Sequence, residues 1–468
     1  MKRSLLLFTL LMLVFTSGVN AAYVRNHPYQ VTQPDGTVIQ CFVSGDEYFN
    51  WLHDEAGFTI IQAEDGYYYY GVRNKDLVTA SPFRVNAVNP ASVGLEPWAK
   101  ISRAEYHRRK DYLNKETGNS NRAPHLGTMN NLVVYIKFSD DTEFTTTRQV
   151  YDDLFNLPAG NSLKSYYTEV SYNQFTIGST HYPACAMTTN YSYTDTHTRS
   201  YFEPYNATTN PNGYNGETQR RLREHALLRD AITWINANSP VPTGLDIDGD
   251  DDNYVDNVCF IVRGGNGAWA SLLWAHRWVL YSYNVFINGK QVWDYTFQPE
   301  SQVDVTTLCH EMFHALGAPD LYHYDDGGLN ISPVSAWDLM ESGSGHMGAY
   351  MKWKYSDNTW VTSIPEITSS GTYTLNPLTS STNNCYKIAS PNSSSEYFVV
   401  EYRKTGGTFE SSLPGSGLIV YRIDPSLDGN ADGPPDEVYI YRPNGTTTVN
   451  GSPWSAYFSS ASGRTAIN

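Results

Sequence analysis

The order of apolar and polar residues along the chain predicts three parts with different secondary structure. In the first part, short apolar runs bounded by turn residues predict strands at residues 38–43, 58–61 and 67–70. In the second part, continuous apolar runs predict buried strands at residues 132–138 and 258–262. Strand patterns return in the last part, at residues 371–375, 397–402, 417–421 and 438–441.

Three other stretches have the pattern of helices. Residues 102–116 are strongly charged and lead into a polar segment at residues 117–124, which contains glycine and proline and is expected to be an exposed linker. Residues 162–170 predict a helix with Ser162 as its N-cap. Residues 217–237 carry apolar side chains along one helical face, and Pro240 is expected to stop that helix.

These elements together predict an α+β fold divided into domains. A chain of 468 residues is too long for a single hydrophobic core. We expect a small N-terminal domain at residues 22–124, a central domain with a mixed sheet at 125–365, and a β-rich C-terminal region at 366–468. The last residues contain no clear closing element, so we expect the natural protein to be longer.

The first 21 residues have the pattern of a secretory signal peptide. Lys2 and Arg3 precede an apolar stretch at residues 5–15, and residues 19–21 supply a cleavage pattern of small residues. No later segment reaches the roughly 18 apolar residues that a membrane helix needs. We therefore expect a secreted, extracellular protein whose mature chain starts near Ala22.

Charge and cysteine content exclude several classes of protein. The net charge of −16 argues against nucleic acid or an anionic membrane as a partner. The five cysteines are Cys41, Cys185, Cys259, Cys309 and Cys385. This odd, small number allows one disulfide and leaves at least one free thiol, so the chain is not a disulfide scaffold.

The run from His310 to Asp320 has the pattern of a zinc site with its own general base. Two histidines four residues apart, His310 and His314, project from one face of a helix. Glu311 lies beside them, where it can take a proton from a metal-bound water. Gly317 lets the chain leave the helix in a left-handed turn, so that Asp320 returns as the third ligand. Three protein ligands and one open position are typical of catalytic zinc.

Two alternatives to this interpretation stay open. The His-Glu-x-x-His pattern also arises by accident on ordinary amphipathic helices, although the added glycine and aspartate at fixed offsets make such an accident rare. His323 competes with Asp320 as the third ligand, but the spacing favours Asp320. Cys309, next to the first ligand, is expected to point away from the metal and pack in the core.

A second metal site is predicted in the acidic segment at residues 246–256. Calcium prefers six to eight oxygen ligands, and alternating carboxylates can supply them in a tight loop. The candidate ligands are Asp246, Asp248, Asp250, Asp252 and Asp256. Asn253 stands where a glycine usually makes the turn, and Cys259 stands where an EF-hand has glutamate, so the loop is not an EF-hand. The alternative is a solvated acidic loop.

A methionine in a turn rich in serine and glycine follows the zinc motif, at residues 335–343. This segment resembles the Met-turn of the metzincin peptidases, with Met340 as the apolar floor below the metal. The sequence Gly-Ala-Pro-Asp-Leu-Tyr at residues 317–322 resembles the immune inhibitor A group, the M6 family, within that clan. The resemblance extends from about residue 132 to about residue 424.

The resemblance implies a metzincin-like domain with a mixed sheet and an active-site helix. It also implies a zinc-dependent endopeptidase that acts on proteins or peptides. The signal-peptide pattern adds that this enzyme is secreted, and the acidic loop adds calcium as a structural ion. An N-terminal domain and a basic linker ahead of a peptidase indicate a pro-domain that an activating protease removes. A permanent accessory domain is the alternative. The group that keeps the zymogen latent is expected to be Cys41, Asp46 or Glu47, and a carboxylate is favoured because Cys41 lies in a strand.

A function of another class is also compatible with parts of the sequence. The β-rich C-terminal region and the 36 tyrosines would suit a secreted adhesive or carbohydrate-binding protein on a catalytically silent peptidase scaffold. The intact Glu311 argues against this alternative, because a scaffold has no use for a carboxylate beside the metal. His276, between Trp274 and Trp278, is left out of the catalytic set, since those tryptophans are expected to be buried.

Overall fold

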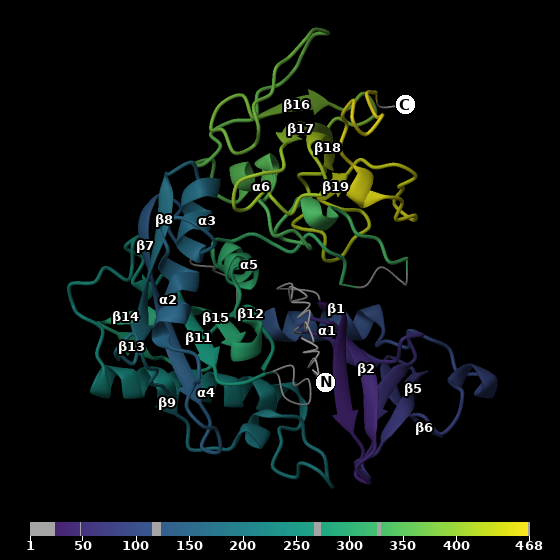
Figure 1. Cartoon of the computed structure of the whole chain (residues 1–468), viewed down its shortest axis with the longest axis vertical. Helices are drawn as coiled ribbons and strands as arrows, with labels where there is room; N and C mark the ends of the chain where they lie inside the picture. Colours follow the sequence, from purple (N-terminus) through teal and green to yellow (C-terminus); the bar gives the residue numbers. More distant parts are fainter. Residues whose placement is uncertain (1–23, 47, 115–122, 266–272, 325–328, 467–468) are drawn as a thin grey trace, which may run out of the picture.

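A computed structural model describes residues 24–46, 48–114, 123–265, 273–324 and 329–466. The expected signal peptide, Glu47 and most of the expected linker lie outside the described residues. The chain forms an α+β structure (Figure 1). Antiparallel sheets form its N-terminal and C-terminal parts, and a mixed sheet forms the part of the sequence between them.

The N-terminal part is a six-stranded antiparallel sheet in which each strand pairs with the next along the chain. Its strands are β1 (Val24–Thr32), β2 (Val38–Gly45), β3 (Asn50–His53), β4 (Thr59–Gln62), β5 (Tyr68–Asn74) and β6 (Leu77–Arg84). Helix α1 (Arg103–Asn114) follows. This part has a small core of its own, which contains Ile39, Cys41 and Ile60.

The central sheet has the strand order β12-β15-β11-β7-β8, with β9 also paired to β7. The strands are β7 (Gly127–Lys137), β8 (Phe175–Tyr182), β9 (Tyr193–Thr194), β11 (Val258–Val262), β12 (His276–Val279) and β15 (Asp294–Pro299). All neighbours pair in parallel except the edge strand β12, which is antiparallel to β15. A small separate sheet contains β10 (Tyr254–Val255), β13 (Phe286–Ile287) and β14 (Lys290–Val292).

Alternate residues of the central strands enter two different cores, because side chains alternate across a strand. Val133 and Cys259 face a core that contains α3 (Leu163–Val170) and α5 (Val305–Ala315). Leu132 and Val258 face the opposite core, against α4 (Gly216–Asn238). Helix α2 (Arg148–Asn156) packs beside β8. Helix α5 is thereby held on one face of a sheet whose other face is also covered.

The C-terminal part is a four-stranded antiparallel sheet that shares its core with the central part. Its strands are β16 (Cys385–Ala389), β17 (Tyr397–Arg403), β18 (Gly417–Ile423) and β19 (Val438–Ile440), and α6 (Ala349–Lys354) precedes them. Val399 and Ile419 lie in the same hydrophobic cluster as Phe313 and Leu316 near the end of α5. The core is therefore continuous across the expected boundary at residue 365.

Short 3-10 turns connect the larger elements at Pro90–Val93, Arg199–Phe202, Glu300–Gln302, Ser335–Trp337 and Pro453–Ser455. Most of the predicted elements are present, including the helix capped by Ser162, whose hydroxyl accepts from the amide of Ser165. The predicted strand at residues 371–375 is wrong, because this stretch has no strand pairing and the side chain of Tyr373 is exposed. Its alternation of threonine, tyrosine and leucine provides no buried face.

All five cysteines are unpaired, so the disulfide that their number allowed is absent among the described residues. Cys309 is buried in the core beside α5, as expected. Across the described ranges, the structure has no helix with the length and apolar character needed to cross a membrane.

Candidate metal centre

Helix α5 carries the two histidines of the predicted zinc motif. The helix begins after Asp304, whose carboxylate accepts hydrogen bonds from the amides of Thr306 and Thr307 at 2.8 and 3.1 Å. It ends just before Gly317, which has a φ of +97° and thus the left-handed conformation that was predicted for it. The chain then doubles back, so that Asp320 faces the helix it has just left.

The side chains of His310, His314 and Asp320 converge on one point. The Nε2 atoms of the two histidines are 3.1 Å apart, and each lies 3.2 Å from Oδ1 of Asp320. His310 and Asp320 are buried, and His314 is partly exposed. Ligand atoms at the corners of a tetrahedron around zinc, each about 2.1 Å from the ion, would lie roughly 3.4 Å apart. The observed spacing fits a zinc ion with small adjustments.

The ring protons of both histidines are held away from this point. Nδ1 of His310 lies 3.0 Å from the carbonyl oxygen of Leu339, and Nδ1 of His314 lies 2.7 Å from that of Ala318. A carbonyl oxygen can only accept, so each Nδ1 carries a proton and donates. In the neutral rings, the Nε2 lone pairs then face Oδ1 of Asp320, which is buried and has no hydrogen-bond partner. When both rings are neutral, these three acceptors have no proton between them, and a cation would satisfy all three.

The charges of these groups are tightly coupled. Burial raises the pKa of Asp320, but the adjacent His314 and His310 outweigh burial and hold this pKa well below its usual range. Burial lowers the pKa of His314, whereas the Asp320 carboxylate outweighs it and raises the pKa to about 9. Without a metal, a proton on His314 thus supplies the positive charge that Asp320 attracts.

Glu311, the predicted general base, is buried on the same helix. Burial raises its pKa, and the charges of His310 and His314 partly offset that effect. Met340 is also fully buried and belongs to the core that contains α5, as expected for an apolar floor.

The second oxygen of Asp320 has a partner that sequence reasoning missed. The hydroxyl of Tyr324 donates to Oδ2 of Asp320 at 2.5 Å. One oxygen of this carboxylate is therefore hydrogen-bonded to Tyr324, and the other faces the histidines. His323, the alternative third ligand, instead places its Nε2 2.5 Å from Oδ1 of Asp436, and both of these side chains are buried. Asp320, and not His323, therefore lies beside the two histidines.

Most of these second contacts have no local signal in the sequence. Leu339 contributes only a main-chain carbonyl, which any residue type would provide. Asp436 lies in a distant loop that meets the site only in the folded chain, whereas Tyr324 follows Asp320 by four residues. The backbone amide of Asn430 donates to the carbonyl of Asp320 at 2.9 Å, which joins these loops beside the site.

The acidic segment at residues 246–256 brings together three of its five candidate ligands. Oxygens of Asp248, Asp250 and Asp256 all lie within 4.8 Å of one another. Asp246 and Asp252 are not in this group, and Asp252 accepts instead from the amide of Tyr254 at 2.8 Å. Asn253 has a φ of +75°, the left-handed turn expected of it.

Electrostatic repulsion is strong in this acidic cluster. Burial, and after it the neighbouring carboxylates, raise the pKa of Asp256 to about 7 and that of Asp250 to about 6. Nζ of Lys290 lies 2.5 Å from Asp248 and neutralises part of the charge. One oxygen of the buried Asp256 has no hydrogen-bond partner. A divalent cation would satisfy that oxygen and relieve the repulsion.

Comparison with known proteins identifies the segment that contains the metal centre. Residues 254–357 match the sequence model of the catalytic domain of immune inhibitor A peptidase M6. This range is narrower than the resemblance seen in the sequence, but it includes α5, Asp320 and Met340. No curated protein matches the chain significantly.

Among solved structures, the crystal structure of metalloproteinase-II from Bacteroides fragilis is similar at 10% identity over 70% of this chain and 84% of that one. The TM-score of that alignment is 0.24, too low to support an argument about the fold. The family match stands alone: over residues 254–357, this chain is similar to the catalytic domain of the M6, or immune inhibitor A, peptidases.

Proposed function

We propose that this chain is a secreted, zinc-dependent endopeptidase, made as a zymogen, that hydrolyses peptide bonds of extracellular proteins. The observation that carries the proposal is the convergence of the Nε2 atoms of His310 and His314 and one carboxylate oxygen of Asp320 without a hydrogen-bond partner, within 3.2 Å of one another. This group lies in the segment that matches the M6 catalytic domain.

His310, His314 and Asp320 would hold the zinc. When bound there, zinc would polarise the scissile carbonyl and make a water molecule more acidic. The proposed role of Glu311 is to accept the proton of the attacking water and to pass it to the leaving amine. Leu339 and Ala318 keep the imidazoles oriented through their carbonyl oxygens. The preference for internal peptide bonds rests on the family.

Contacts between the N-terminal domain and the metal centre support the proposal that the protein is made as a zymogen. Tyr48 and Tyr106 of that domain pack on Tyr324, with ring centroids 5.5 and 5.2 Å from its ring. Tyr324 in turn binds Asp320 through its hydroxyl. The three tyrosines form a layer of rings over the third ligand, so we propose that a substrate reaches the centre only after this domain leaves.

Asp46 lies beneath this layer and favours the carboxylate over Cys41 as the group that maintains latency. It is buried, and it accepts hydrogen bonds from the hydroxyl of Tyr106 at 2.7 Å and from the amides of Tyr48 and Phe49 at 2.9 and 2.8 Å. Cys41 lies inside the core of the N-terminal sheet. Glu47, the other carboxylate considered, is outside the described residues.

Polar contacts of α1 hold the domain at a second point. His107 and Lys110 lie 3.4 and 3.5 Å from the carboxylate of Asp432, and Arg103 donates to the carbonyl of the same residue. The Asp432 side chain is 57% exposed, so these pairs contribute little each. Weak polar contacts of this kind suit a domain that dissociates after the linker is cut.

Calcium is the proposed occupant of the acidic cluster at Asp248, Asp250 and Asp256. The orphaned oxygen of Asp256 and the mutual repulsion of the carboxylates support this assignment. Its role would be structural, because Ile247 and Val255 of the same segment pack in the core on the face of the sheet opposite α5.

The test is digestion of casein by the protein after cleavage in the linker near Arg122, with the uncut chain as reference. We expect activity only after cleavage, loss of activity with a zinc chelator, and recovery on adding zinc. His310→Ala and Asp320→Ala should lower the zinc content as well as the activity. Zinc binding by the cleaved wild type without hydrolysis of any protein substrate would favour the silent scaffold instead.

A further inference from the structure

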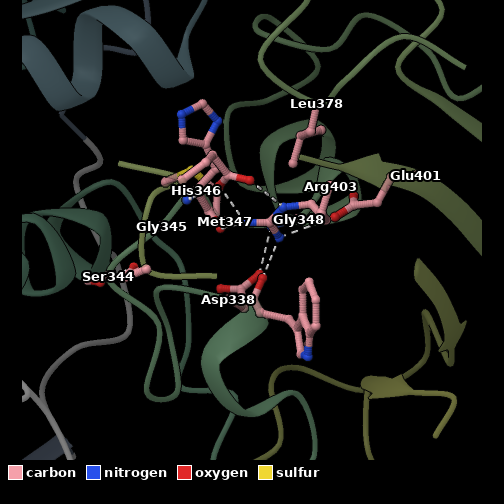
Figure 2. Close-up of polar contacts among 12 residues, drawn as sticks. Asp338, Ser344, Gly345, His346, Met347, Gly348, Leu378, Glu401 and Arg403 are labelled. Carbon is pink, nitrogen blue, oxygen red and sulfur yellow. Dashed lines mark hydrogen bonds and ion pairs between the residues drawn. The ribbon is translucent and has the colours of Figure 1, made fainter. Parts of the chain in front are cut away.

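A fully buried arginine at the end of β17 connects the C-terminal sheet to the segment that contains Met340. Arg403 lies bidentate on Glu410, with Nε 2.9 Å and Nη2 2.6 Å from its oxygens, and Nη1 is 3.3 Å from Glu401. Arg403, Glu401 and Glu410 are at most 1% exposed. The guanidinium is thus held in one orientation. Figure 2 shows Glu401 beside Arg403.

The remaining donors of Arg403 bind main-chain carbonyls and not side chains. Nη1 donates to the carbonyl oxygen of Trp337 at 2.5 Å. Nη2 donates to the carbonyl oxygen of His346 at 3.0 Å, and both Arg403 and His346 are labelled in Figure 2. With Glu401 and Glu410, these carbonyls use all five N–H groups of the guanidinium. Trp337 and His346 flank the turn at residues 338–345, so one side chain fixes both ends of that turn.

The turn is also held internally by a buried carboxylate. Asp338 accepts from the amide of Met340 at 2.9 Å and from the amide of Gly348 at 2.7 Å. The amide of Gly343 donates to the carbonyl of Asp338 at 2.9 Å. These internal hydrogen bonds, together with the bonds from Arg403 at both ends, fix the position of the turn relative to β17.

The position of this turn affects the metal centre through the carbonyl oxygen of Leu339. The carbonyl oxygen of Leu339, between Trp337 and Met340, accepts the Nδ1 proton of His310. The orientation of the His310 ring, and hence of its Nε2 lone pair, depends on where this carbonyl lies. His314 differs, because its carbonyl partner Ala318 lies in the loop directly after its own helix.

Stability alone explains this buried network poorly. Burying three charged groups has a desolvation cost that their mutual attraction often only offsets, and apolar replacements of similar size are frequently as stable. An arginine with this geometry supplies something that an apolar residue cannot, namely two donors aimed at two fixed carbonyls.

We propose that Arg403, aligned by Glu410, is a positioning residue of the metal centre that orients His310 through the turn at residues 338–345 and the carbonyl of Leu339. The inference rests on the proposed function in one respect, that His310 binds zinc. It assigns to the C-terminal sheet an indirect part in metal binding, through the orientation of one ligand.

The experiment measures zinc affinity of the full-length folded protein by competition with a chelating dye, together with the visible spectrum of the cobalt-substituted protein. Arg403→Lys keeps the charge but loses the two-carbonyl geometry. We expect a 10- to 100-fold weaker zinc affinity and a changed cobalt spectrum. Glu410→Gln keeps the arginine but loosens its alignment, and should weaken zinc binding by a smaller factor.

Arg148→Lys is the matched control. Arg148 is an equally buried arginine of the central part, and it also donates to two main-chain carbonyls, those of Pro183 and Tyr191, at 2.9 Å. Its loss should lower the melting temperature in a similar way while leaving zinc affinity and the cobalt spectrum unchanged.

The outcomes separate the two proposals. Wild-type zinc affinity in folded Arg403→Lys and Glu410→Gln overturns the positioning role, and so does an equal loss of affinity in Arg148→Lys. If Arg403→Lys does not fold, Glu410→Gln decides alone. Failure of the proposed function appears differently, as wild-type protein whose zinc binding is absent or is unaffected by His310→Ala.

Discussion

The N-terminal sheet β1–β6 and the C-terminal sheet β16–β19 both flank the metal centre, yet they are attached to it in different ways (Figure 1). The N-terminal sheet has a core of its own and reaches the centre through the rings of Tyr48 and Tyr106. The C-terminal sheet contributes side chains such as Val399 to the core that supports α5, and Arg403 to the turn beneath it.

This difference indicates which sheet the metal centre can lose. A part with its own core can leave more readily than a part that shares one, although Val43 of the N-terminal sheet packs against Trp274 of the central part. A part that shares one core with its neighbour would expose that core on leaving. The difference fits a removable N-terminal domain and a C-terminal sheet that completes the catalytic unit, although the domain boundaries themselves stay predictions.

The largest effect is expected from removing one sheet or the other. A chain that ends at residue 365 should lose cooperative unfolding and zinc binding, because the core around Phe313 and Leu316 would be opened to water. A chain that starts at residue 123 should keep both. Calorimetry of the two proteins measures the cooperativity of unfolding, and metal analysis measures their bound zinc. Normal zinc binding by the chain that ends at residue 365 would contradict the shared core.

A second prediction distinguishes loss of the catalytic proton acceptor from loss of the structure that holds the metal. Glu311→Ala should lower the rate of peptide hydrolysis by about 10²- to 10⁴-fold, because it removes the proposed proton acceptor. Zinc content should stay at one ion per chain, since Glu311 is not in the group of ligand atoms. The measurement is the turnover rate of the cleaved enzyme beside metal analysis. Wild-type turnover in this variant would exclude the assigned role.

The metal centre was predictable because its residues are close in sequence. His310, His314 and Asp320 lie on one helix and the loop after it, so helical periodicity and one glycine determine their meeting. The contacts that orient His310 were not predictable. Arg403 meets Trp337 across 66 positions of the chain, and no local pattern specifies such a pairing.

In the fold too, elements with a strong local signal were predictable and those that depend on distant contacts were not. The continuous apolar run at residues 258–262 predicted β11 with its observed bounds, because a strand buried on both faces has a strong local signal. Strands such as β12 and β15 had no comparable signal, since their place depends on neighbours far along the chain. The acidic loop is intermediate: the alternation of aspartates was visible, but Asp252 turns away to bind the amide of Tyr254.

A moderate effect is expected from weakening the N-terminal contact. Tyr106→Phe keeps the ring that packs on Tyr324 but removes the hydroxyl that donates to the buried Asp46. The loss of one such hydrogen bond costs about 1 kcal/mol, which corresponds to roughly fivefold more of the open form. The basal activity of the uncut chain should rise by about that factor.

Tyr69→Phe is the control for this prediction. Tyr69 also donates its hydroxyl to an aspartate, Asp65, at 2.8 Å, but on an exposed part of the N-terminal sheet. Its basal activity should equal that of the wild type. Equal basal activity in both variants and the wild type would mean that the hydroxyl of Tyr106 does not maintain latency.

The smallest effect on the metal centre is expected from the acidic loop, which packs on the face of the central sheet opposite α5. Without calcium, the raised pKa values of Asp250, about 6, and Asp256, about 7, mean that the folded protein holds these protons more tightly than the unfolded chain does. Their contribution to stability is therefore present below about pH 4 and is lost as the pH rises through 6 and 7.

Calcium should reverse this loss, because it neutralises the ionised carboxylates and binds only the native state. The increase in melting temperature on adding calcium should be small at pH 5 and larger at pH 8, with zinc affinity unchanged at each pH. Asp250→Asn should weaken the response, whereas Asp252→Asn, which removes one charge outside the cluster, should retain it. A melting temperature that is the same with and without calcium at pH 8 would identify the loop as a solvated acidic surface, and a change in zinc affinity would show that the two faces of the sheet are coupled.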